Sequence, residues 1–245
     1  LVCLLVLVFY FGRQHDFDKA KQQSAVQASQ LSHYFSSELA RFATIPSLVS
    51  ANNLVKSFVS NKKIGEQAVN YYLEDIQKAS GASDVYLMDL TGSVIASSNW
   101  QVDYTFLGSN FAFRPYFYLA KNKQKVAYFA LGMRSSERGF YFSEPVIEDG
   151  KVIAVVSLKV NAKKFEQDRQ LLNTSQSTHF YISLPDSVIV MSDVASWRLT
   201  SLNRLNEQAM ANLIDSRRYL SHIPKRLAYS GQALSENIAL QRIVL

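Results

Sequence analysis

Apolar residues recur at two different spacings along the chain, and the change of spacing divides it. From Asp16 to Phe42 they recur every three or four positions without an internal glycine or proline, which predicts one long amphipathic helix. Pro46 is expected to end this helix, because proline lacks the backbone donor and disfavours helix in the preceding residue. Two more helices are expected, at residues 47–59 and about 65–79. The first third of the chain is therefore predicted to be helical.

A strand-like pattern begins at Asp84. The apolar segments Asp84–Asp89 and Val94–Ser98 flank a turn that contains Gly92, which predicts a β-hairpin. A short helix and three further strands are expected at residues 114–121, 126–132, 140–146 and 152–160. Together these elements predict a five-stranded antiparallel sheet with helices on its faces, an α+β fold.

A second round of the same pattern starts near Ala162. A helix is expected at residues 162–172, followed by strands at 180–184 and 188–192. The segment GSVIAS with a later Trp100 resembles DSVIVM with a later Trp197. This similarity predicts two tandem copies of one small sheet domain, and a chance match between two hairpins is the alternative.

The first twelve residues, LVCLLVLVFYFG, are an uninterrupted apolar stretch. As a helix they would rise about 18 Å, against about 30 Å for the hydrocarbon core of a bilayer. Arg13 then opens a polar helical stretch without a small-residue cleavage signature. We expect residues 1–12 to be the end of a transmembrane helix, with a buried core helix as the alternative.

Composition and motifs narrow the possible functions. The formal net charge is +6, and such a positive charge favours a small anionic ligand. The Lys and Arg residues are spread along the chain rather than gathered in a stripe, which argues against a nucleic-acid partner. Cys3 is the only cysteine, and the four histidines lack ligand spacing, so neither a metal site nor a cofactor is expected. The sequence contains none of the phosphate-loop, nucleophile-elbow or zinc-protease motifs. Catalysis is therefore not expected of this chain.

Two basic residues stand in apolar surroundings. Arg114 lies among four aromatic residues in NFAFRPYF, and a guanidinium there needs an anion, either a ligand carboxylate or an internal acidic residue. Lys159 ends a mostly apolar strand face that it shares with Val155 and Ser157. It either extends to solvent or supplies a second cation to a pocket. Tyr141, on the neighbouring strand, and the donor-rich loop 133–139 are expected nearby.

Four segments resemble the periplasmic region of the C4-dicarboxylate sensor histidine kinases, which are double Cache (PDC-type, PAS-like) sensors of two-component systems. They are NFAFRPYF, YFALGMRSSERGFYFSEPV, GKVIAVVSLKV and, more weakly, SVIVMSDVASWRLTSL. The resemblance implies a long stalk helix, a membrane-distal module that binds succinate, fumarate or malate, and a membrane-proximal module that usually stays empty.

The resemblance also implies a set of ligand-binding residues. By motif position the arginine and lysine of the family site correspond to Arg114 and Lys159. Tyr116, Ser135 and Tyr141 are carried over less directly. Phe111 belongs to the same set, although some relatives have tyrosine there, so this chain lacks one hydroxyl donor.

The expected organisation follows from pattern and resemblance together. Residues 1–12 end a membrane helix and residues 13–80 form the stalk and packing helices. Residues 81–161 form the distal module, which we call the first module. Residues 162–245 form the proximal module, which we call the second module. The chain is expected to lie in the periplasm, to be anchored in the bacterial inner membrane and to form a homodimer through its long helix.

Three other functions remain open. The first is the sensor region of a chemotaxis receptor or diguanylate cyclase that binds another small organic acid or amino acid. The second is a hydrolase with an unrecognised active site, and the third is a structural stalk that binds no small molecule.

Overall fold

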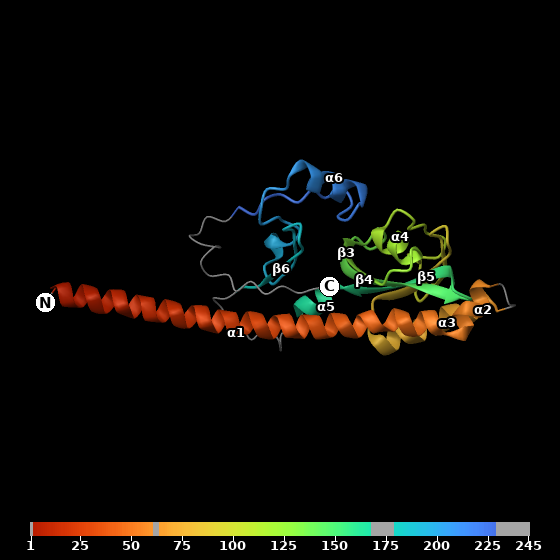
Figure 1. Cartoon of the computed structure of the whole chain (residues 1–245), viewed down its shortest axis with the longest axis horizontal. Helices are drawn as coiled ribbons and strands as arrows, with labels where there is room; N and C mark the ends of the chain where they lie inside the picture. The colour runs from red at the N-terminus through yellow and green to blue at the C-terminus, as the bar shows by residue number, and fades with distance from the viewer. Residues whose placement is uncertain (1, 61–63, 168–178, 229–245) are drawn as a thin grey trace.

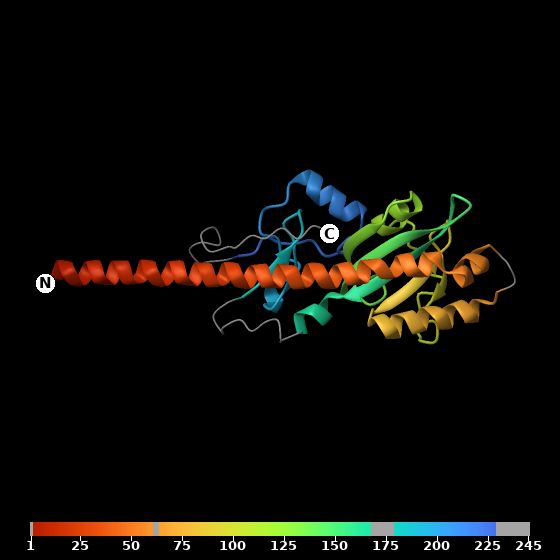
Figure 2. The ribbon, with the colours of Figure 1, turned by 60° about the horizontal axis from the view of Figure 1, so that its bottom comes forward.

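A single long helix forms the N-terminal part of the molecule, and the other elements lie along it. The computed structural model describes residues 2–60, 64–167 and 179–228, and its first helix, α1, spans Val2–Ala51. The N-terminal part of α1 projects away from the body, while its C-terminal part lies against the first module (Figures 1 and 2). Within the described residues, no helix combines the length and the apolar content that crossing a membrane requires.

The predicted helix break at Pro46 is wrong, because α1 continues through this proline to Ala51. Pro46 has no amide hydrogen to donate to the carbonyl of Phe42, four residues earlier. The hydroxyl of Thr44 donates a hydrogen bond to the carbonyl of Arg41, in the same turn, at 2.8 Å. Phe42, one turn before the proline, is fully buried in the core. Packing against the sheet therefore outweighs the local preference of the sequence.

Two short helices complete the N-terminal third. Helix α2, Asn53–Val59, begins where the side chain of Asn52 accepts a hydrogen bond from the amide of Leu54 at 2.8 Å. Helix α3, Glu66–Ser80, ends at Gly81, which has a left-handed φ of 68°. Helix α3 lies where a helix is expected, whereas the helix expected at residues 47–59 begins only at Asn53, because residues 47–51 belong to α1.

The predicted five-stranded antiparallel sheet is confirmed. Its strand order is β2-β1-β5-β4-β3, and all neighbouring strands are antiparallel. The strands and the one helix between them are β1 (Asp84–Met88), β2 (Val94–Ser97), α4 (Pro115–Lys121), β3 (Val126–Leu131), β4 (Arg138–Glu148) and β5 (Lys151–Asn161).

The two faces of this sheet have different coverings. Helices α1 and α3 cover one face, and α4 lies on the other (Figures 1 and 2). Along β5, Val156 and Leu158 belong to the core beneath α1, while Val155 belongs to the aromatic cluster beneath α4. The predicted alternation is confirmed, and it places Lys159 on the α4 face.

The second module is smaller in the described residues. Its predicted hairpin is confirmed as a two-stranded antiparallel sheet. The expected helix at 162–172 begins as predicted and is described as far as Gln167, and residues 168–172 lie outside the described residues. The elements are α5 (Ala162–Gln167), β6 (Tyr181–Ser183), β7 (Ile189–Ser192), the 3-10 turn η1 (Ala195–Trp197) and α6 (Glu207–Asp215).

Candidate ligand-binding site

Arg114 is a buried cation at the start of α4. It is the N-cap of that helix, with Pro115 in the first helical turn, and it is only 2% exposed. Its Nη2 donates to the carbonyl oxygen of Leu131 at 2.7 Å, and its Nη1 donates to that of Arg217 at 2.8 Å. Among the described residues, no carboxylate forms an ion pair with it. Two neutral carbonyls thus hold the guanidinium, and its charge has no counterion in this part of the chain.

Lys159 is also buried, at 1% exposure, so it does not extend to solvent. Its Nζ donates to Ser135 Oγ at 2.8 Å. Two carboxylates lie further off, with Asp84 Oδ2 at 3.7 Å and Glu137 Oε2 at 4.0 Å. Unlike Arg114, this cation therefore has acidic neighbours within its own module.

Burial raises the pKa of the Asp84 carboxyl above its usual range, and the attraction of Lys159 opposes this increase without cancelling it. The negative charge of Glu137 adds to the increase. Because desolvation is the largest cause, the ionised form of Asp84 is costly in this environment.

Two predicted tyrosines form the aromatic wall of the site. The rings of Tyr116 and Tyr141 are stacked, with centroids 4.9 Å apart and an interplanar angle of 3°. Burial raises the pKa of Tyr116 to about 12 and that of Tyr141 well above its usual range, so both hydroxyls stay protonated. The Tyr86 hydroxyl donates to that of Tyr116 at 3.0 Å, and the ring of Phe111 packs 5.7 Å from that of Tyr86. Phe111 thus joins this aromatic layer through Tyr86.

Three predicted residues meet beside Gly132, directly after β3. A methyl group on Gly132 would lie 2.6 Å from Ser135 Oγ, 3.1 Å from the Tyr141 hydroxyl and 3.4 Å from Lys159 Nζ. Arg114 binds the carbonyl of the adjacent Leu131. The two buried cations and two hydroxyl groups therefore converge on the end of β3.

Sequence reasoning missed the loop 216–220 of the second module, which follows α6. The amide of Leu131 donates to the carbonyl of Arg218 at 2.8 Å. The Arg218 guanidinium lies 4.6 Å from the centroid of the Tyr128 ring, and its Nε donates to the Tyr128 hydroxyl at 3.1 Å. No local pattern in the sequence pairs these segments, which are about 90 residues apart.

A second missed residue is Asp84, which is paired with Lys159 in the β1–β5 register. The signal for it was present, since both residues lie at strand ends that the apolar pattern had already defined. Only the register of the two strands was needed to bring them together.

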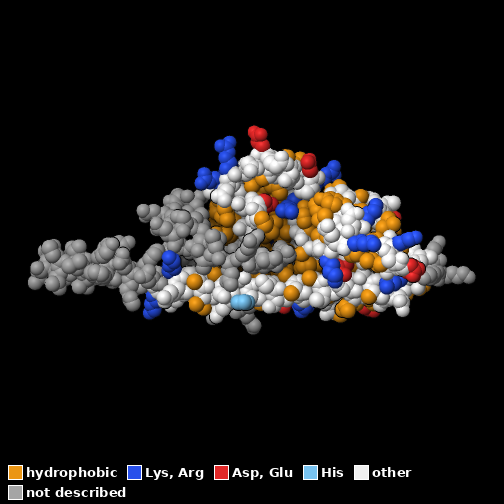
Figure 3. Space-filling model, viewed as in Figure 1, with side chains coloured by type: hydrophobic (Ala, Val, Ile, Leu, Met, Phe, Trp, Pro, Cys, Tyr) orange, Lys and Arg blue, Asp and Glu red, His pale blue; other side chains and the backbone are white. Residues whose placement is uncertain are grey.

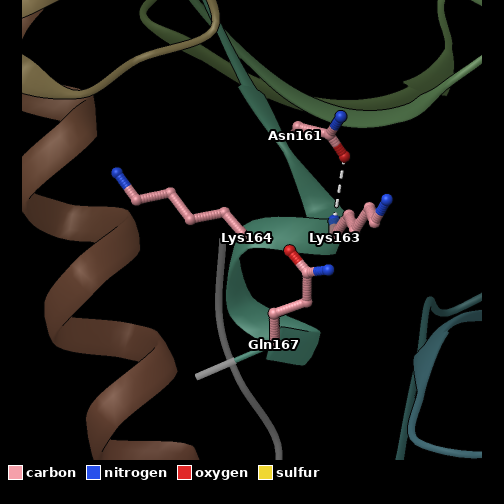
Figure 4. A pocket seen from close by; sticks show the side chains of 4 residues that line it. All are labelled: Asn161, Lys163, Lys164 and Gln167. Atoms are coloured by element: carbon pink, nitrogen blue, oxygen red, sulfur yellow. Dashed lines mark hydrogen bonds between the residues drawn. The ribbon is translucent and has the colours of Figure 1, made fainter. Parts of the chain in front are cut away.

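The rest of the described surface offers fewer possible binding sites. Lys and Arg side chains are scattered over the face in Figure 3 and form no stripe there. A shallow depression beside α5 is lined by Asn161, Lys163, Lys164 and Gln167, none of which is a predicted ligand residue (Figure 4). Lys164 already donates to the carbonyl of Gly81 at 2.8 Å. Within the described residues, no group of three or more His, Cys, Asp or Glu side chains could hold a metal ion.

Comparison with known proteins gives the family. No family model matches the chain. The crystal structure of the sensor domain of the Vibrio cholerae histidine kinase DctB superposes with a TM-score of 0.79 at 32% sequence identity, covering 89% of this chain and 83% of that one. The chain belongs to the DctB sensor-domain family. It is thus a two-component sensor domain with the predicted α+β fold of Cache type, and the predicted resemblance is confirmed.

Curated relatives and more distant structures agree with this assignment. The C4-dicarboxylate transport sensor protein DctB of Rhizobium meliloti is 25% identical over 86% of this chain, and that of Pseudomonas aeruginosa is 26% identical over 81%. The matched region is 34% and 32% of these proteins, so the chain spans about a third of their length. The ligand-binding domain of the P. aeruginosa amino acid chemoreceptor PctC, at 14% identity and a TM-score of 0.54, covers 76% of this chain and 80% of its own and shares the fold.

Proposed function

We propose that this sensor domain binds a C4-dicarboxylate such as succinate, fumarate or malate in its first module. The observation that carries the proposal is Arg114, a buried guanidinium without a carboxylate partner among the described residues. A carboxylate satisfies such a planar fork with two parallel hydrogen bonds. Lys159 and the Ser135 hydroxyl, at the same end of β3, are suited to the second carboxylate.

The surroundings favour an acid with two charges and limited bulk. The stacked rings of Tyr116 and Tyr141 restrict water, which strengthens ion pairs with Arg114 and Lys159. Because its hydroxyl stays protonated, Tyr141 can donate to a carboxylate between the two cations. A monocarboxylate would leave one of the cations without its ligand contact.

We further propose the arrangement of the domain in the cell. Residues 1–12 end a membrane helix in the inner membrane, residues 13–80 form the stalk and packing helices, and residues 81–161 and 162–245 form the distal and proximal modules in the periplasm. The full protein passes the signal across the membrane to a histidine kinase. Support comes from the length of α1 and from the names of the relatives.

A homodimer is part of this proposal. The apolar stripe that suggested it runs from Val26 to Phe42, and its part from Leu31 onward packs in the chain's own core. Val26 of the same stripe is exposed, so we propose that the interface uses the part of α1 around Val26.

Titration calorimetry with succinate, fumarate, malate and butyrate tests the ligand. Arg114→Ala should weaken dicarboxylates by about 2–5 kcal/mol, because a buried charged contact is lost. Arg114→Lys should also bind poorly, since a point charge does not replace the fork. The control is Arg204→Ala, which removes an exposed arginine outside the proposed ligand set. Unchanged succinate affinity in both Arg114 variants would contradict the proposal.

One observation favours a second candidate, an amino acid bound by a chemotaxis-type Cache domain. Asp84 and Glu137 lie near Lys159, so this end of the site could accept an ammonium group while Arg114 holds a carboxylate. The structurally similar PctC domain is complexed with GABA. Titration with GABA separates the two candidates, because the dicarboxylate proposal expects succinate to bind more tightly than GABA.

A further inference from the structure

The loop 216–220 belongs to the second module, but two of its carbonyl oxygens accept hydrogen bonds at the site of the first. Its carbonyl oxygens at Arg217 and Arg218 accept from Arg114 Nη1 and from the amide of Leu131, both at 2.8 Å. Figures 1 and 2 both show the end of α6 beside β3. These bonds lie at the same end of β3 where Lys159 and Tyr141 converge.

This loop brings additional positive charge to the site. The guanidinium groups of Arg114 and Arg217 each lie 5.1 Å from the centroid of the Phe113 ring. Arg218 also lies here and forms an ion pair with Asp186 at 3.0 Å. Among the described residues, neither Arg114 nor Arg217 has a carboxylate partner. Both guanidinium groups lie beside the same ring, with Arg114 buried and Arg217 exposed. Their like charges repel one another, so docking of the loop is opposed by electrostatics in the absence of an anion.

The backbone of the loop is in an unfavourable conformation. Arg217 and Leu220 have φ angles of 46° and 55°, in the left-handed region that residues other than glycine rarely adopt. Such conformations persist where the surrounding contacts impose them, and they concentrate at ligand-binding segments. Here the conformation at Arg217 accompanies a carbonyl that reaches the guanidinium of Arg114.

We infer that loop 216–220 is a lid on the ligand site of the first module and that Arg217 is a further anion-recognition residue. A bound dianion supplies the countercharge for Arg114 and Arg217, so it strengthens docking of the lid. The identity of the anion rests on the proposed function, but the electrostatic opposition to docking does not. By thermodynamic reciprocity, docking of the lid strengthens ligand binding by the same factor by which the ligand strengthens docking, so a change that undocks the lid weakens ligand binding by at most that factor.

The first test measures succinate affinity by calorimetry and hydrogen exchange of the Leu131 amide, which reports lid docking because its acceptor is Arg218. Succinate should slow this exchange in the wild type. Arg217→Ala should lose affinity about tenfold, within the usual range of coupling between sites, and should show less slowing. Arg204→Ala is the matched control, an exposed arginine of the same module. Wild-type affinity and slowing in Arg217→Ala would overturn the inference.

The second test needs no ligand and separates the two proposals. Raising sodium chloride screens the repulsion between the arginines, so Leu131 exchange should slow with salt in the ligand-free protein, and less so in Arg217→Ala. If the wild type fails to bind succinate but shows this salt effect, the dicarboxylate proposal fails and the lid stands. If Leu131 exchange is insensitive to salt in the wild type, the lid inference fails whatever succinate does.

Discussion

Asp84 and Lys159 are partners in the β1–β5 ladder, and Asp84 Oδ2 lies 3.7 Å from Lys159 Nζ. Both side chains are buried on the same face of the sheet. The carboxyl of Asp84 therefore occupies the kind of position beside Lys159 that we propose for a ligand carboxylate. An acidic residue at this place lowers the affinity for any anion that binds there.

Replacing this carboxyl should strengthen dicarboxylate binding. Asp84→Asn keeps the size of the side chain and removes a negative charge next to the proposed site. We expect succinate affinity to rise, by up to about 1 kcal/mol for two charges near 4 Å apart in a solvent-like medium and more where water is excluded. Calorimetry of this variant and of the exposed-site control Asp103→Asn would decide it. Weaker succinate binding in Asp84→Asn would show that Asp84 holds Lys159 in place for the ligand.

The same pair predicts a dependence of stability on pH. Because burial raises the pKa of Asp84, the folded protein binds this proton more tightly than the unfolded chain does. The stabilising contribution is therefore complete below the unfolded pKa, about 3.9, and is lost as pH rises through the folded pKa. Urea unfolding from acid to neutral pH should show the wild type losing stability relative to Asp84→Asn. A relative gain with rising pH would mean that the attraction of Lys159 dominates.

A methyl group added at Gly132 should displace the proposed ligand residues without unfolding the domain. The added methyl of Gly132→Ala would meet the ends of the Ser135, Tyr141 and Lys159 side chains, which can move more readily than backbone. We expect strongly reduced succinate binding and a stability loss of about 1–3 kcal/mol, typical of overpacking. Gly65→Ala is the control, because a methyl there meets nothing within 4 Å. Normal succinate affinity in Gly132→Ala would place the ligand elsewhere.

The strands could be predicted because their pattern is local. Alternation along β5 was sufficient to place Lys159 on the face opposite Leu158, and the structure confirms it. Proline at position 46 misled the prediction, since its local cost is outweighed by packing of α1 on the sheet, which no local pattern contains. The hydrogen bond from Arg114 to Arg217 joins residues 103 positions apart, in two modules, so the lid had no local signal.

Lys159 should contribute more to the affinity for dicarboxylates than to the affinity for monocarboxylates. Lys159→Met keeps most of the aliphatic stem and removes the ammonium group, so succinate should weaken more than butyrate. Exposed Lys163→Met is the matched control. Calorimetric titration of both acids against all three proteins gives the comparison. Equal proportional losses for succinate and butyrate would mean that the second carboxylate is held elsewhere, for example by the loop 133–139.

Glu166 on α5 joins the two modules, and we expect its charge to hold them together. Its carboxylate accepts from Arg138 on β4 through two hydrogen bonds of 2.6 and 2.7 Å, and Arg198 Nε lies 3.2 Å from it. It also accepts from the amide of Ser192 at 3.2 Å, so strands of both sheets meet at one buried acid. Glu166→Gln leaves two arginines without their anion, and loss of one partner of a buried ion pair costs about 3–5 kcal/mol.

Measuring unfolding, proteolysis and succinate affinity in Glu166→Gln should distinguish a loss of contact between the modules from a loss of contact with the ligand. Glu166 lies outside the proposed ligand set, so Glu166→Gln should lower the free energy of unfolding and speed proteolysis between the modules. It should weaken succinate only through the loosened lid, and therefore less than Arg114→Lys does, because the first module keeps its cations. The control Glu207→Gln removes an exposed acid at the start of α6. Wild-type unfolding and proteolysis in Glu166→Gln would show that apolar packing, rather than this carboxylate, joins the modules.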